Sequence, residues 1–66
     1  MKVQLNGKEK QIKPETSLKQ LIENEGMAGK RLAAEVNQDI ITRSEHASFI
    51  LSEGDIIEIV HAIGGG

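Results

Sequence analysis

The segment from residue 56 to residue 63 constrains the fold of this chain more than any other, because it is strand-like and apolar on both faces. Alternation along a strand gives two sets of side chains, first Ile57, Ile59, His61 and Ile63, and second Ile56, Glu58, Val60 and Ala62. A strand of this kind is the natural centre of a sheet. We expect the first set to face the core. The second set is either covered by neighbouring side chains or exposed as a surface for a partner.

The length of the chain limits it to one domain. A chain of 66 residues buries only ~60% of the surface that its unfolded form exposes, so its core is small and leaves no room for a deep active site. Hydrophobic residues make up 38% and charged residues 27% of the sequence, which is typical of a soluble globular domain. Disordered and membrane-embedded chains are therefore excluded.

Charge and cysteine content exclude further classes of function. The net charge is -2 and Phe49 is the only aromatic residue, so neither phosphate neutralisation nor base stacking supports nucleic-acid binding. Cysteine is absent, which removes disulfides, thiolate zinc sites and cysteine nucleophiles. His46 and His61 lack carboxylates at zinc-ligand spacing, so we predict no metal site and expect both at the surface. No apolar N-terminal segment resembles a signal peptide, and we expect a cytoplasmic protein.

Residues 1–13 are predicted to form a β-hairpin. Apolar side chains at positions 1, 3 and 5 alternate with polar ones, as in a strand with one buried face. Asn6 and Gly7 form a strong two-residue turn signal, because both residues tolerate positive φ. Residues 8–13 are the expected return strand, and their polar character suits a sheet edge.

A helix is predicted to begin at about Leu18. Ser17 and Gln20 match a capping box, in which each side chain accepts a hydrogen bond from the other residue's backbone N–H. Leucine and isoleucine at positions 18, 21 and 22 fall on one helical face, and Gly26 supplies the C-terminal stop. We expect this apolar face to pack into the core of so small a domain.

The remaining pattern predicts three more strands. Residues 32–36 alternate as a strand, residues 37–39 form a turn into a short strand at Ile40 and Ile41, and residues 43–47 form a helical turn or loop. Phe49 and Leu51 are expected to point inward, before a tight turn at residues 52–55. The predicted fold class is α+β, a mixed sheet of four to five strands curled around one main helix. The last strand lies at its centre beside the first.

Gly64, Gly65 and Gly66 directly follow the last strand. Without Cβ atoms, such a segment can thread a channel too narrow for other residues and bring its terminal carboxylate to a reaction centre. We therefore predict a single domain over residues 1–63 and a flexible working tail over residues 64–66. The alternative is a frayed end without a function of its own.

Together these features resemble the ubiquitin-like β-grasp sulfur carriers. Three segments look like the ThiS family, which carries sulfur for the thiazole ring of thiamin: residues 36–41 (VNQDII), 54–60 (GDIIEIV) and 62–66 (AIGGG). The resemblance spans the whole chain and is strongest from Val36 onward. Thr42 and His46 stand where ThiS proteins often have proline and tryptophan, and we interpret both as loop variation.

The resemblance implies a protein co-substrate rather than an enzyme, with no bound cofactor. A ThiF-type adenylating enzyme would consume ATP to join the Gly66 carboxylate to AMP. A persulfide donor such as a cysteine desulfurase would convert it to a thiocarboxylate, and the thiazole synthase ThiG would accept the sulfur. Gly64 and Gly65 would thread into the partner sites. The expected partner-binding patch consists of Ile56, Val60, Ala62, His61 and Ile63.

Three alternatives remain open. The small subunit of molybdopterin synthase shares the fold and the final Gly-Gly, but its last strand commonly leads into a proline-containing approach, unlike residues 61–63 here. A ubiquitin-like binding module would use the same surface without chemistry at Gly66. A protein modifier would pass the acyl adenylate to a lysine amine. Adding an alanine after Gly66 should abolish sulfur transfer and leave simple binding nearly intact.

Overall fold

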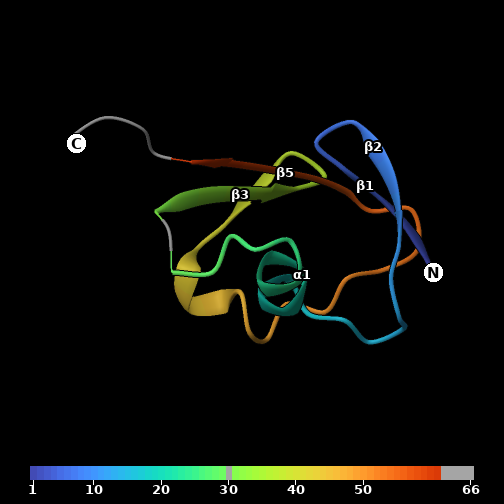
Figure 1. The fold of residues 1–66 in the computed structure, drawn as a ribbon, viewed down its shortest axis with the longest axis horizontal. Coiled ribbons are helices and arrows are strands. Elements are labelled where there is room, and N and C mark those ends of the chain that lie inside the picture. Colours follow the sequence, from blue (N-terminus) through green and yellow to red (C-terminus); the bar gives the residue numbers. More distant parts are fainter. Residues whose placement is uncertain (30, 62–66) are drawn as a thin grey trace.

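The structure is a computed structural model that describes residues 1–29 and 31–61. Its elements, in chain order, are β1 (Lys2–Leu5), β2 (Lys8–Gln11), α1 (Leu18–Asn24), β3 (Leu32–Val36), β4 (Asp39–Ile41), the 3₁₀ helix η1 (Arg43–Glu45) and β5 (Ile56–His61). Figure 1 shows the sheet as one layer and α1 as the other. The predicted elements are all present, and the predicted turn at residues 43–47 contains η1.

The strands form one mixed sheet in the order β2-β1-β5-β3-β4. β5 is parallel to β1 and antiparallel to β3, while β1–β2 and β3–β4 are antiparallel pairs. Parallel strands need a crossover connection, and the segment containing α1 provides it on one face of the sheet. The predicted mixed sheet around one helix, with the last strand central beside the first, is confirmed.

Two tight turns set the register of the antiparallel pairs. Asn6 and Gly7 have φ of 50° and 82°, and Asn37 and Gln38 have φ of 53° and 73°. Positive φ at both central residues matches the right-handed twist of the flanking strands. The predicted hairpin turn is confirmed at Asn6, although β2 ends at Gln11 rather than at residue 13. Pro14 follows closely and cannot donate to a ladder, which limits the length of that strand.

Helix α1 begins at the predicted capping box. The Gln20 backbone N–H donates to Ser17 Oγ at 3.1 Å, and the Ser17 N–H donates to Gln20 Oε1 at 2.9 Å. The chain leaves the helix through Gly26, whose φ of 75° is the left-handed conformation expected at a helix end. Both predicted boundaries are confirmed, so the local sequence determines where the helix begins and ends.

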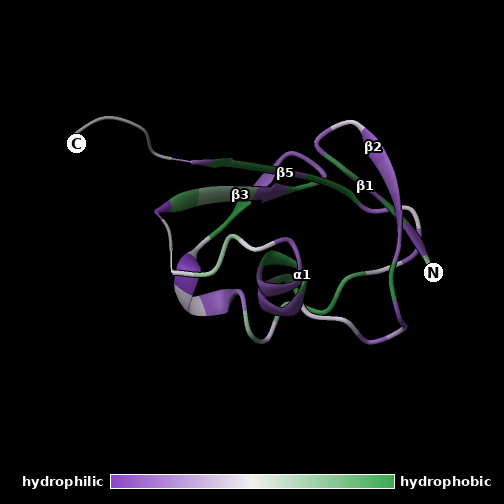
Figure 2. Ribbon diagram, viewed as in Figure 1, coloured by the Kyte–Doolittle hydropathy of each residue, from purple (hydrophilic) through white to green (hydrophobic). Residues whose placement is uncertain are grey.

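The core lies between α1 and the inner face of the sheet. Figure 2 shows the helix with a hydrophobic side toward the strands and a hydrophilic side away from them. The buried hydrophobic residues are Val3, Leu5, Leu18, Leu21, Ile22, Ala34, Val36, Ile41, Leu51, Ile57 and Ile59. Phe49 is half-buried against this cluster, so the predicted inward residues at positions 49 and 51 both contact the core.

Candidate functional site

The two faces of β5 differ sharply in exposure. Ile57 and Ile59 face the core, with 0% and 4% of their surface exposed, whereas Ile56 and Val60 are 51% and 61% exposed on the other face. No second layer covers that face in the part of the chain that the structure describes (Figure 1). The outward orientation predicted for Ile56 and Val60 is therefore confirmed. Their partner-binding role is taken up below as a proposal.

A third apolar side chain extends this surface toward the sheet edge. Val60 pairs with Ala33, Glu58 pairs with Glu35, and Glu35 pairs in turn with Ile40 of the edge strand β4. Ile40 is 71% exposed. We call Ile40, Ile56 and Val60 the outer patch. The sequence analysis placed Ile40 in a short strand but not in the partner-binding patch. The turn has two residues, 37 and 38, rather than the predicted three, and this register puts Ile40 on the outer face.

The Asn6 side chain holds β5 where β1 ends. After Leu5 the β1 backbone turns away, and the Asn6 amide takes its place: Oδ1 accepts from the Ile59 N–H at 2.8 Å and Nδ2 donates to the Ile59 carbonyl at 3.2 Å. One side chain thus satisfies both backbone groups of a residue in the central strand. Each such bond contributes about 1 kcal/mol net. The sequence indicated the turn at Asn6 but gave no sign of this second role.

Asn37 holds the beginning of the same strand from the other side. Its Oδ1 accepts from the Ile56 N–H at 3.0 Å, and its backbone N–H donates to the Ile56 carbonyl at 2.7 Å. Its Nδ2 donates to Asp55 Oδ1 at 3.0 Å, while Asp55 Oδ2 accepts from the Ser52 N–H at 2.7 Å. The tight turn and the start of β5 are therefore fixed as one unit. This rigid base orients the exposed side chains that follow.

His61 is the last described residue of β5 and lies at its exposed end. It lines a shallow hollow of about 300 Å³ together with Val60 and with Arg31 and Arg43 from neighbouring segments. Its position has the core-facing parity of Ile57 and Ile59, but this end of the strand extends past α1, which explains its exposure (Figure 1). The other predicted site residues, Ala62, Ile63, Gly64, Gly65 and Gly66, lie outside the described residues, as does the predicted domain end at residue 63.

The expectation of a surface position is confirmed for His61 and wrong for His46. His46 is only 8% exposed, and its Nε2 lies 3.0 Å from the Ile41 carbonyl oxygen. A carbonyl only accepts, so Nε2 carries the proton in this contact. The backbone carbonyl of His46 also accepts from the Lys19 N–H at 3.0 Å. Helix η1 turns the chain back toward α1 and buries the ring, a tertiary effect that spacing along the sequence could not reveal.

Residues 1–29 and 31–61 contain no group of three histidine, cysteine or carboxylate side chains arranged to hold a metal ion. Within the same ranges no helix has the length and apolar character needed to cross a membrane. What the described site offers is an exposed, rigidly held strand that runs toward the glycine segment.

The domain is similar in fold to a solved thiamine biosynthesis protein. The crystal structure of the thiamine biosynthesis protein (ThiS) from Geobacter metallireducens superposes with a TM-score of 0.85, at 22% identity and with both chains covered completely. Its solution structure gives a TM-score of 0.79 and covers 100% of this chain and 88% of the other. The sheet order, the single helix and this likeness define a ubiquitin-like β-grasp domain.

Sequence comparison identifies the family. The model of the ThiS family matches residues 3–66. The chain is 35% identical over 65 residues to the sulfur carrier protein ThiS of Bacillus subtilis, covering 97% of this chain and 98% of that protein. It is 38% identical over 66 residues to the thiazole synthase of Magnetococcus marinus, but spans only 20% of that longer protein. The thiazole synthase of Paramagnetospirillum magneticum is 33% identical, again over 20% of its length. The chain belongs to the ThiS family.

Proposed function

We propose that this chain is the sulfur carrier for the thiazole ring of thiamin, with Gly66 as its reacting residue. The observation that carries the proposal is the ThiS-family match, which extends through the final glycine at residue 66. The sulfur carrier of Bacillus subtilis is matched over nearly its whole length, which supports the carrier role. The thiazole synthases that contain a matching segment support a thiazole synthase as the acceptor.

The chemistry explains why partner enzymes are needed. A carboxylate is a poor electrophile, because its charge repels nucleophiles and oxide is a bad leaving group. A ThiF-type enzyme would join the Gly66 carboxylate to AMP and release pyrophosphate from ATP. A persulfide from a cysteine desulfurase would displace AMP, and a thiol would then reduce the S–S bond to leave the thiocarboxylate. A thiocarboxylic acid is more acidic than a thiol, so the sulfur stays ionised and nucleophilic near neutral pH.

The carrier itself supplies reach and a docking surface. Three extended residues span ~10 Å, so residues 64–66 can carry the carboxylate into a partner while the domain stays outside. The small cross-section of Gly64 and Gly65 suits a narrow channel. Ordering this segment costs entropy, which docking contacts must offset. Ile56 and Val60, together with His61, Ala62 and Ile63, are the proposed contacts. Ile40 lies on the same face of the sheet, two strands away.

The proposal makes the chain a co-substrate that binds no cofactor, with ATP consumed by its partner. It includes a cytoplasmic location, where ATP is available for the adenylation. Intact mass spectrometry after incubation with ATP, a ThiF-type enzyme and a persulfide source tests it. We expect the mass gain of one oxygen replaced by one sulfur, located at Gly66, and no gain in a variant that lacks Gly66. No gain with a partner that is active on another carrier would contradict the proposal. If the sulfur were accepted in molybdopterin synthesis rather than by thiazole synthase, the chain would be a carrier for the molybdopterin pathway instead.

A further inference from the structure

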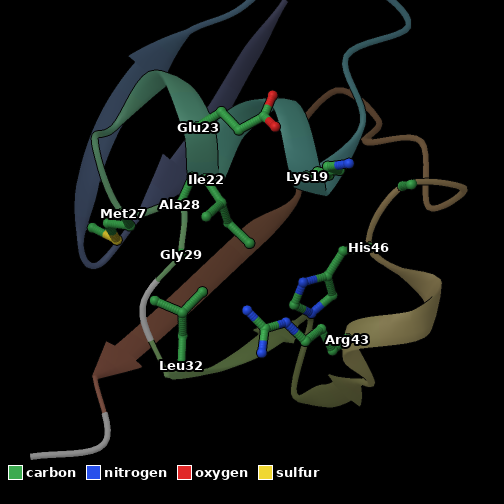
Figure 3. A pocket seen from close by; sticks show the side chains of 10 residues that line it. Lys19, Ile22, Glu23, Met27, Ala28, Gly29, Leu32, Arg43 and His46 are labelled. Carbon is green, nitrogen blue, oxygen red and sulfur yellow. The ribbon is translucent and has the colours of Figure 1, made fainter.

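A second hollow, of about 340 Å³, lies between the end of α1, the start of β3 and η1, and shares Leu32 and Arg43 with the hollow at His61. Figure 3 shows Ile22, Met27 and Leu32 along its apolar side, with Arg43 and His46 on the facing wall. Small-molecule sites are typically hollows of about 300–1,000 Å³ with an apolar lining and a few convergent polar groups. The volume of this hollow lies at the lower end of that range, and its lining combines apolar side chains with a few polar ones.

The charged groups of this hollow favour an anion. Lys19 and Arg43 both line it, and Glu23 is the only carboxylate among its lining residues. Within the described residues, neither Lys19 nor Arg43 makes an ion pair. In Figure 3 the Arg43 guanidinium points into the hollow toward Leu32, whereas the Glu23 carboxylate points away from Arg43. The local charge is therefore positive in a chain whose net charge is -2.

His46 adds a buried polar group to the same wall. Its Nε2 is held by the Ile41 carbonyl at 3.0 Å, which fixes the ring. No buried side-chain nitrogen or oxygen of the described residues lacks a partner, so the remaining Nδ1 is reached by solvent, and the ring faces the hollow (Figure 3). Because Nε2 carries the proton, Nδ1 is an acceptor, so the donors for an anion come from Arg43 and not from His46.

We propose that this hollow binds a small organic anion in which a carboxylate or phosphate head is attached to an apolar group. The head lies against Arg43, whose planar guanidinium forms paired hydrogen bonds with either kind of oxyanion. The apolar group lies on Ile22 and Leu32. This adds a ligand site to the carrier. Leu32 and Arg43 also line the hollow beside Val60 and His61, so the ligand lies next to the proposed docking contacts.

Titration of the ¹⁵N-labelled full chain, followed by NMR, tests the proposal. The probes are phenylacetate, phenyl phosphate and the neutral phenylacetamide. We expect the two anions to shift the amide signals of Met27, Leu32 and Ala47, and the neutral amide to bind about tenfold more weakly, the loss expected for one hydrogen bond to a charged group. The tighter anion identifies the preferred head group. Equal binding of phenylacetamide, or shifts elsewhere only, would overturn the proposal.

Two variants locate the anion contact. R43Q should weaken phenylacetate binding about tenfold, with the amide spectrum otherwise retained because Arg43 is exposed. K8Q removes the same charge from the exposed strand β2, far along the sheet, and should leave binding unchanged. R43K keeps the charge without the planar guanidinium, and its affinity for phenylacetate should lie between those of R43Q and K8Q. If R43Q and K8Q behave alike, the proposed contact is wrong. Every readout is binding to this chain, so either result leaves the sulfur-carrier proposal as it stands.

Discussion

The inner and outer faces of β5 both carry two large aliphatic side chains but have opposite surroundings, and the outer face also carries Glu58. Ile57 and Ile59 are buried against α1, while Ile56 and Val60, one residue away along the backbone, remain largely exposed. Burial of an isoleucine stabilises a fold by about 1.5–3 kcal/mol. The inner residues contribute that stabilisation, and the outer residues keep their apolar surface available for another molecule. Similar side chains are thus buried or exposed according to their parity along the strand.

The largest effect is expected on the inner face. Replacing Ile57 with alanine removes a fully buried side chain and should lower the free energy of unfolding by about 3–4 kcal/mol, through lost transfer free energy and the cavity left behind. Chemical denaturation measures this change. I57V, expected to cost about 1 kcal/mol, keeps the comparison measurable if I57A does not fold. I56A is the matched control, and a loss as large as that of I57A would erase the proposed difference between the faces.

The next largest effect concerns binding. V60D places a charge in the outer patch and should weaken binding to the adenylating partner by about 2 kcal/mol, roughly thirtyfold, as for a central contact of an interface. Its free energy of unfolding should change by less than about 1 kcal/mol, the span of strand propensities. Calorimetric titration measures the first quantity and denaturation the second. An unfolded V60D would show that Val60 contributes to the core instead.

A smaller effect is expected at the side chain that holds the strand. N6G keeps a residue that adopts positive φ but removes both side-chain bonds to Ile59, and should cost about 1–2 kcal/mol. Hydrogen exchange of the Ile59 amide should accelerate. N6D retains the acceptor oxygen and should protect that amide better than N6G does. Equal protection in the two variants would argue against a role for Oδ1.

The smallest effect is expected at the sheet edge. I40T retains a β-branched side chain on an exposed position and should change the free energy of unfolding by less than about 0.5 kcal/mol. Partner binding should weaken measurably but less than in V60D, because rim positions contribute less than central ones. Unchanged binding in the same calorimetric titration would restrict the outer patch to β5 alone.

Local patterns predicted the elements, and tertiary pairing decided what the patterns left open. The alternation in β1 and β5, the Ser17 capping box and the Asn6 turn each depend on residues close in sequence, and all three are confirmed. The burial of His46 depends on how η1 folds back on α1, and the exposure of Ile40 depends on its register against Glu35. The first does not follow from spacing along the chain, whereas the second depends on a turn of two residues, 37 and 38, rather than the predicted three.

In the candidate site, too, some features were predicted from local sequence and others depend on tertiary contacts. The outward positions of Ile56 and Val60 follow from alternation and are confirmed. The role of Asn6 in satisfying Ile59, 53 positions away, could not be predicted, because it depends on where β1 leaves the parallel ladder. The hollow at Arg43 brings together three separate segments of the chain, and no local pattern indicated it.

The central position of β5 also governs when the carrier can work. Ribosomal synthesis delivers the β1–β2 hairpin and the β3–β4 hairpin first, and these two hairpins share no ladder until β5 pairs with β1 on one side and with β3 on the other. The strand that leads to the glycine segment is therefore the one that joins the two halves of the sheet. A partner that docked on the outer patch, as proposed, would recognise a surface that exists only after this joining, and partially folded chains would not compete for it.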